Sequence, residues 1–177
     1  MAEKEIVIPV KLDAKTFRRF GWFNVFILRK QWVRPAVFAA ILTGFAVAAL
    51  LSRKSESLLI AGVLLAVGLG LPLVYIGSFL TQINRQVKRY GLKSPRAVYT
   101  VRLSPDAMRV TNDQKKEAPL EAAWKDAWAA YRVRGCIYLY AAPARAFLLP
   151  DGQADADTDA VWAYLSARMG DRCRDRR

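Results

Sequence analysis

The chain has 177 residues, a formal net charge of +13, two cysteines and no histidine. Without histidine, zinc sites that use histidine and nucleophiles activated by histidine are excluded. The basic excess indicates an anionic partner, either a membrane surface or a nucleic acid.

The first predicted element is a short strand. Residues 5–12, EIVIPVKL, have the pattern of a strand, and Pro9 indicates an edge position or a bulge. Residues 1–5 contain no apolar run, so we expect no cleavable signal peptide. We assign residues 1–13 to an N-terminal strand that joins a cytoplasmic sheet.

Residues 14–34 form the second predicted element, an interfacial helix. Asp13 can cap it, since its carboxylate can accept from the first free amides. The segment mixes aromatic rings with cations, a combination suited to the headgroup region of a bilayer. Pro35 disfavours helical geometry at Arg34, so we expect a bend there.

A transmembrane hairpin is predicted over residues 35–80. Stretches 35–52 and 58–80 have 18 and 23 residues and no charged side chain, and they reach roughly 27 and 35 Å as helices. Residues 53–57 are too few to recross the membrane, so the helices run antiparallel. Pro72 is a candidate kink. Because ion pathways need polar groups at membrane depth, we expect an anchor and not a pore.

Cations flank the hairpin on the side of both termini. By the positive-inside rule, both termini are cytoplasmic and the linker faces outward. The candidate lipid-headgroup contacts are Arg18, Arg19, Arg29, Lys30, Arg34, Arg85, Lys88 and Arg89. Since the chain is tethered to a membrane, lipid is the simpler anionic partner, and we expect no nucleic acid.

Small residues recur every four positions in both stretches. They lie on one stripe of each helix and allow close approach of backbones in lipid. This predicts a packing seam, either within the hairpin or between subunits, made of Ala36, Ala40, Gly44, Ala48, Gly62, Ala66 and Gly70.

After the hairpin we expect a helical extension within residues 81–95, ended by Gly91, and a C-terminal domain over residues 96–170. Alternating polarity and turn signals predict strands at 97–103, 107–111, 116–120, 129–133, 136–141 and 145–149, followed by a helix at 158–169. These elements predict an α+β membrane protein, with a small antiparallel barrel or bent sandwich capped by a C-terminal helix. Residues 171–177 are expected to be a disordered basic tail.

Few side chains in this domain suggest chemistry. Aromatic residues Trp124, Trp128, Tyr138, Tyr140 and Trp162 are expected to form the core and its rim rather than a ligand box. The carboxylates of Asp151, Asp155, Asp157 and Asp159 are expected to lie in a solvated loop. Cys136 and Cys173 should not form a disulfide in the cytoplasm.

The order of elements and three short motifs resemble the YcxB-like family of bacterial membrane proteins. The motifs are WKDAW at 124–128, IYLY at 137–140 and AFLLP at 146–150. In the family a basic residue usually follows the proline, whereas Asp151 follows it here. The resemblance implies a pleckstrin-homology-like C-terminal domain, a place in the bacterial inner membrane and no established enzymatic activity.

No acid–base or nucleophile set appears, so we expect neither an enzyme nor a bound cofactor or metal. We expect a membrane-anchored interaction module whose cytoplasmic β domain binds a protein, a peptide or anionic lipid headgroups. The alternative is a small accessory subunit of a membrane transport or enzyme complex. The expected partners are the lipid bilayer and either an unknown protein or a second copy of the chain.

Overall fold

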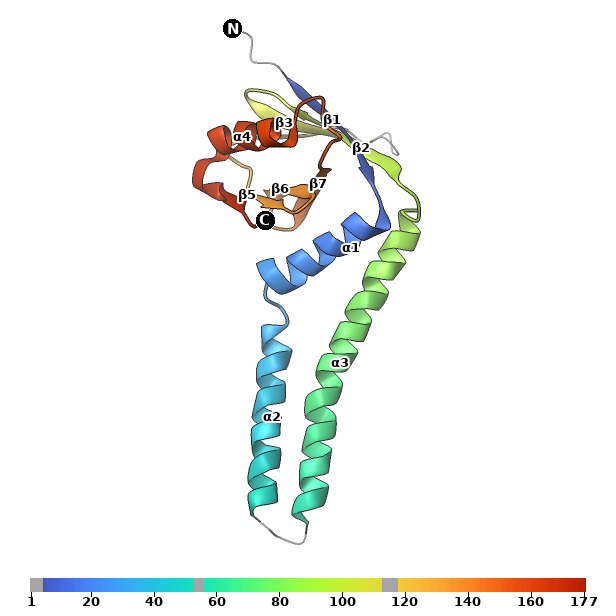
Figure 1. The fold of residues 1–177 in the computed structure, drawn as a ribbon, viewed down its shortest axis with the longest axis vertical. Helices are drawn as coiled ribbons and strands as arrows, with labels where there is room; N and C mark the ends of the chain where they lie inside the picture. Colours follow the sequence, from blue (N-terminus) through green and yellow to red (C-terminus); the bar gives the residue numbers. More distant parts are fainter. Residues whose placement is uncertain (1–4, 53–55, 113–117) are drawn as a thin grey trace. The chain divides into compact units, whose positions relative to one another are not determined.

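The computed structural model describes residues 5–52, 56–112 and 118–177 and has an α+β fold (Figure 1). The chain divides into two compact units. The β unit comprises Met1–Phe20 and Gly91–Arg177, and the helical unit comprises Gly21–Tyr90. The β unit is therefore built from two segments that are distant in the sequence.

The helical unit is an antiparallel pair of long apolar helices, α2 (Val33–Leu51) and α3 (Ser57–Arg89). Both are long and apolar enough to cross a membrane, with mean hydropathies of 1.9 and 2.4. Only 6% and 11% of their most apolar windows are buried, which is unlike the core helix of a soluble protein. The linker at 53–55 lies outside the described residues.

The helices touch along a line that differs from the predicted seam. At Gly68, an added Cβ would lie 3.1 Å from Leu42 Cβ and 3.6 Å from the Ala39 carbonyl oxygen, so only glycine fits without displacement. Ala46 and Ala61 are also buried. By contrast, a Cβ added at Gly44, Gly62 or Gly70 meets nothing within 4 Å. The predicted stripe therefore does not form the contact within the hairpin, and Ala40, Ala48 and Ala66 on it are exposed.

The predicted helix at 14–34 is interrupted. Helix α1 (Ala14–Trp22) passes into a short π-helix, η1 (Phe23–Leu28). The helical conformation then ends at Lys30, which has a φ of 48°. The expected bend at Arg34 is wrong, because α2 already begins at Val33. Pro35 is tolerated in its first turn, where a backbone N–H has no helical partner.

Helix α3 continues past the apolar stretch, as expected. It runs through Pro72 without a break and ends at Arg89, and Gly91 follows with a φ of 65°. Near this end, a Cβ added at Gly21 would lie 2.5 Å from Ile83 Cδ1, so glycine permits the last residues of α1 to lie against α3. Trp22 and Phe26 stack at 4.3 Å, and both rings meet Phe79 edge-on.

The β unit contains two sheets of four strands each. The first has the order β1-β2-β3-β4 and is wholly antiparallel. Its strands are β1 (Ile6–Leu12), β2 (Arg96–Leu103), β3 (Ala107–Asn112) and β4 (Leu120–Ala123). The N-terminal strand thus joins the sheet, as predicted. The strand predicted at 116–120 begins at Leu120 instead, and positions 113–117 lie outside the described residues.

The second sheet has the order β7-β6-β5-β8. Its strands are β5 (Ala129–Val133), β6 (Cys136–Ala142), β7 (Arg145–Pro150) and β8 (Cys173–Asp175). Strand β8 pairs in parallel with β5, so the prediction of a disordered tail at 171–177 is wrong. The two sheets do not close into a barrel. Instead, the Tyr99 hydroxyl joins them by donating to the Leu148 carbonyl and accepting from the Leu148 amide.

Helix α4 (Thr158–Met169) covers part of the β unit, as expected of the C-terminal helix. It buries Val161, Leu165 and Met169 among the core side chains. Its Tyr164 hydroxyl donates to the Leu103 carbonyl at 3.3 Å, which fixes the helix at the Leu103 end of β2. A 3-10 turn, η2 (Gly170–Arg172), then leads into β8.

The predicted aromatic core is largely confirmed. Trp124, Tyr138 and Tyr140 are buried, whereas Trp128 is 39% exposed and forms part of the rim. Trp162 is half-buried beneath the Arg132 guanidinium, 6.0 Å from its ring centre. These rings therefore serve the packing of the β unit.

Candidate functional site

The candidate site in the helical unit is a basic end next to an aromatic cluster. Because α2 and α3 are antiparallel, the start of α2 and the end of α3 lie at the same end of the hairpin. Six predicted headgroup contacts are at this end, and all six are exposed: Arg29, Lys30, Arg34, Arg85, Lys88 and Arg89. The structure thus leaves these six side chains exposed on the segments that flank the two apolar helices at this end.

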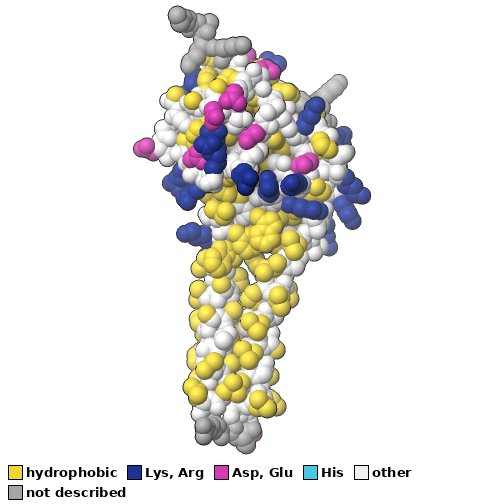
Figure 2. Space-filling view, in the orientation of Figure 1, with side chains coloured by type: hydrophobic (Ala, Val, Ile, Leu, Met, Phe, Trp, Pro, Cys, Tyr) yellow, Lys and Arg dark blue, Asp and Glu magenta, His cyan; other side chains and the backbone are white. Residues whose placement is uncertain are grey.

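Aromatic side chains border these cations. Trp22 and Trp32 are 41% and 44% exposed. The Trp32 indole N–H donates to the Phe26 carbonyl, across the non-helical turn at Lys30. On the face drawn in Figure 2, hydrophobic side chains cover the length of the hairpin between its linker and this end. Apolar, aromatic and basic side chains therefore follow one another along the unit, as at a bilayer interface.

The other two predicted contacts, Arg18 and Arg19, belong to the β unit. Both are exposed on α1. The helix is capped as expected, since the Thr16 amide donates to Asp13 Oδ1 at 2.8 Å. Hydrogen bonds from Thr16 hold the pKa of Asp13 below its usual range, so the cap stays ionised at neutral pH.

The acidic loop before α4 is solvated, as expected. Asp151, Asp155, Asp157 and Asp159 are all exposed, and Asp157 is the N-cap residue of α4. Across the described ranges, no three cysteine or acidic side chains are grouped so that they could hold a metal ion. This loop therefore offers no ligand set.

One carboxylate of the loop has a structural partner that the sequence did not indicate. Asp159 pairs with Arg132, whose exposed fraction is only 7%. Hydrogen bonding and charge attraction from Arg132 lower the pKa of Asp159. The carboxylate of Asp159 compensates the charge of the buried Arg132 on β5. The contact also fixes the start of α4 against this strand.

Arg172 has a similar structural role that no sequence motif indicates. Its guanidinium donates to the carbonyl oxygens of Trp124 at 3.0 Å, Lys125 at 2.9 Å and Ala127 at 2.6 Å. These bonds hold the turn between β4 and β5 against the segment that leads into β8. Arg172 therefore belongs to the fold and not to a binding surface.

The cysteines are not placed for nucleophilic chemistry. Cys136 is buried, and burial raises its thiol pKa to about 12. Cys173 is partly exposed, and burial also raises its pKa. A thiol with a raised pKa is mostly protonated and unreactive at neutral pH.

Comparisons with protein-family models, curated proteins and solved structures give no match to this chain.

Proposed function

We propose that the chain is a membrane-anchored binding module. The two-helix hairpin spans the bilayer, and the β unit lies in the cytoplasm, where it binds a protein, a peptide or anionic lipid headgroups. The observation that carries the proposal is the exposed apolar surface of α2 and α3, with exposed cations before the start of α2 and near the end of α3. In water such a surface would drive association or aggregation.

The charge distribution supports an orientation with both termini inside. The linker sequence at 53–57 has two cations and one acid, whereas the opposite end of the hairpin has six exposed cations within the described residues. Basic residues next to membrane spans stay on the cytoplasmic side. In a bacterium, the place suggested by the YcxB-like resemblance, this is the inner membrane.

Among the possible partners, anionic headgroups are the best supported. A cation close to a negatively charged leaflet contributes about 1 kcal/mol, and the exposed tryptophans suit the same depth of the bilayer. Each of the six cations can therefore add to the attraction for acidic lipid. We assign the role of headgroup contact to them, with Arg18 and Arg19 of α1 as additional contacts.

The lipid partner can be tested with the full chain in neutral detergent micelles. We expect added phosphatidylglycerol to raise the melting temperature more than phosphatidylcholine does, and salt to reduce the difference. Replacing Arg85, Lys88 and Arg89 by Gln should remove most of the difference. A matched control replaces Arg102, Lys125 and Arg174, three exposed cations of the β unit, and should retain it. Equal stabilisation by both lipids in the wild type would contradict the lipid assignment.

A pleckstrin-homology-like identity of the β unit belongs to the same proposal. Its support is the order of elements: four antiparallel strands, three further antiparallel strands and then a helix. The hairpin is inserted between the first and second strands. This arrangement also fits the YcxB-like resemblance.

A second candidate function is that of an accessory subunit or homo-oligomer. It is favoured by the small residues that do not face the partner helix of the hairpin, among them Gly44 and Gly62. Small residues on a lipid-facing surface permit close contact with further helices. Native co-purification after mild detergent extraction, compared between the wild type and Gly44→Leu, would distinguish this role from lipid binding alone.

A further inference from the structure

The β unit contains a cavity of about 270 Å³ between its two sheets. The cavity is lined by residues of β2, β3, β4 and β7 and by the chain just before β4. Its described lining residues are Val98, Tyr99, Val110, Asn112, Ala118, Pro119, Leu120, Arg145 and Phe147. This volume is close to the lower end of the range for small-molecule sites.

Strand register explains why the cavity lies where it does. In the first sheet, side chains that share a face form successive rows: Leu103 with Met108, then Val101 with Val110, then Tyr99 with Asn112. The first two rows are buried and apolar, and α4 is fixed at the Leu103 end. The third row, Tyr99 with Asn112, contains polar groups and borders the cavity. It lies at the opposite end of the sheet from Leu103, where α4 is attached.

The second sheet repeats this progression. In β7, Leu149, Phe147 and Arg145 alternate along one face, opposite Ile137, Leu139 and the end of β6. Leu149 is buried, Phe147 is half-buried and Arg145 is exposed. The same face that builds the core therefore ends in a cation at the cavity.

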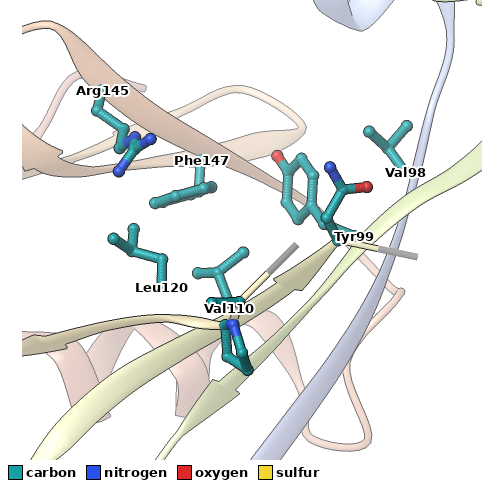
Figure 3. A pocket seen from close by; sticks show the side chains of 9 residues that line it. Val98, Tyr99, Val110, Leu120, Arg145 and Phe147 are labelled. Atoms are coloured by element: carbon teal, nitrogen blue, oxygen red, sulfur yellow. The ribbon is translucent and has the colours of Figure 1, made fainter. Parts of the chain in front are cut away.

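The cavity is lined by both apolar and polar groups, and Asn112 and Arg145 supply polar side chains. Figure 3 shows Arg145, Phe147 and Leu120 on one side and Tyr99 and Val98 on the other. The Tyr99 ring meets Phe147 edge-on at 5.6 Å. The Tyr99 hydroxyl donates to and accepts from Leu148, and burial raises its pKa, so Tyr99 stays neutral. Arg145 has no ion-pair partner within the described residues.

We propose that this cavity binds a small organic monocarboxylate, with its apolar body between Phe147, Leu120 and Val110 and its carboxylate on Arg145. An arginine can hold a carboxylate through two parallel hydrogen bonds, and the apolar side chains of the cavity can contact the remainder. A phosphate dianion is less well matched, because Arg145 is the single cation among the described lining residues. The site is independent of the basic end of the hairpin and adds a ligand to the proposed module.

The probes that test the site are 4-phenylbutanoate and two compounds of the same skeleton, 4-phenylbutanol and 4-phenylbutylamine. The full chain is placed in nanodiscs of zwitterionic lipid, and binding is measured by ligand-observed NMR titration against empty nanodiscs. We expect saturable binding of the carboxylate, at least about tenfold weaker binding of the alcohol and none of the amine. Equal affinity for the acid and the alcohol would overturn the proposal.

Variants locate the binding. Arg145→Gln should weaken carboxylate binding by about tenfold and leave binding of the alcohol unchanged, because only the charged contact is lost. Arg102→Gln removes an exposed cation on the opposite face of β2 and should have no effect. Leu120→Trp should block both ligands by filling the cavity. If Leu120→Trp does not fold, Arg145→Gln still tests the site. An unchanged affinity of Arg145→Gln for the carboxylate would contradict the assignment of Arg145 as the carboxylate contact.

Discussion

At the scale of single residues, the ion pair of Arg132 and Asp159 links two elements of the β unit. Arg132 is buried on β5 and lies over Trp162, and its charge is compensated by a carboxylate at the start of α4. A buried cation left without its partner is strongly unfavourable. The pair therefore links the second sheet to α4.

The pair should make stability depend on pH in the acid range. Because Arg132 lowers the pKa of Asp159 from its ordinary 3.8, the contribution is complete above that value and is lost as pH falls through the folded-state pKa. We expect Asp159→Asn to lower the melting temperature at pH 7. The difference from the wild type should shrink below pH 4. A difference that is constant from pH 7 to pH 3 would contradict the ion pair.

Arg172 should contribute through its bonds to three backbone carbonyls. We expect Arg172→Gln to lower the free energy of unfolding of the β unit by about 2 kcal/mol, since hydrogen bonds from a charged donor are lost. Arg174→Gln, an exposed change on β8, is the control. Chemical denaturation followed by tryptophan fluorescence measures both variants. Equal stability of the two variants would mean that the Arg172 contacts carry little energy.

At the scale of elements, the contact between α2 and α3 depends on where the small residues face. Gly68 touches Leu42, whereas Gly44 faces away from α3. Four-residue spacing identifies a stripe but not its direction, since each helix of the hairpin has small residues on more than one side. The contact side became apparent only once the two helices were paired.

Two leucine substitutions should separate these surfaces. Gly68→Leu should destabilise the hairpin by about 1–3 kcal/mol, because the new side chain collides with α2. Gly44→Leu should leave hairpin stability unchanged, since nothing lies within 4 Å of its Cβ. Denaturation in mixed micelles, followed by circular dichroism, provides the comparison. Similar losses in both variants would contradict the observed pairing.

Much of the element order followed from local patterns. Apolar length indicated the two helices, and alternation indicated most of the strands, because both depend on nearby residues. Three features were missed, two of them because they depend on partners distant in the sequence. The segment at Cys173–Asp175 becomes a strand only by pairing with β5, Lys30 breaks the predicted helix at 14–34, and Arg132 needs Asp159.

The candidate sites show the same division. The cations beside the hairpin could be proposed from the sequence, because their position relative to the apolar spans is itself the signal. The cavity could not be predicted from the sequence, although Arg145, Phe147 and Leu149 alternate there. A single strand does not define which of its faces is inward. The alternation therefore places Arg145 on the core-facing side of β7 only once the opposite sheet is known.

At the scale of the whole molecule, the hairpin separates two segments that build one β unit. Strand β1 pairs with β2 across the full hairpin sequence. In an orientation with both termini inside, these two segments meet on the same side of the bilayer. The pairing of β1 with β2 and the proposed orientation are therefore consistent with each other.

The orientation is tested most directly by cysteine accessibility. Cys136 and Cys173 are replaced by Ala, and single cysteines are introduced as Glu56→Cys beside the linker and Asp106→Cys in the exposed turn between β2 and β3. An impermeant maleimide is applied to right-side-out vesicles of a bacterial host, before and after they are opened. We predict labelling of Glu56→Cys in intact vesicles and of Asp106→Cys only after opening. Labelling of Asp106→Cys in intact vesicles would contradict a membrane anchor with a cytoplasmic β unit.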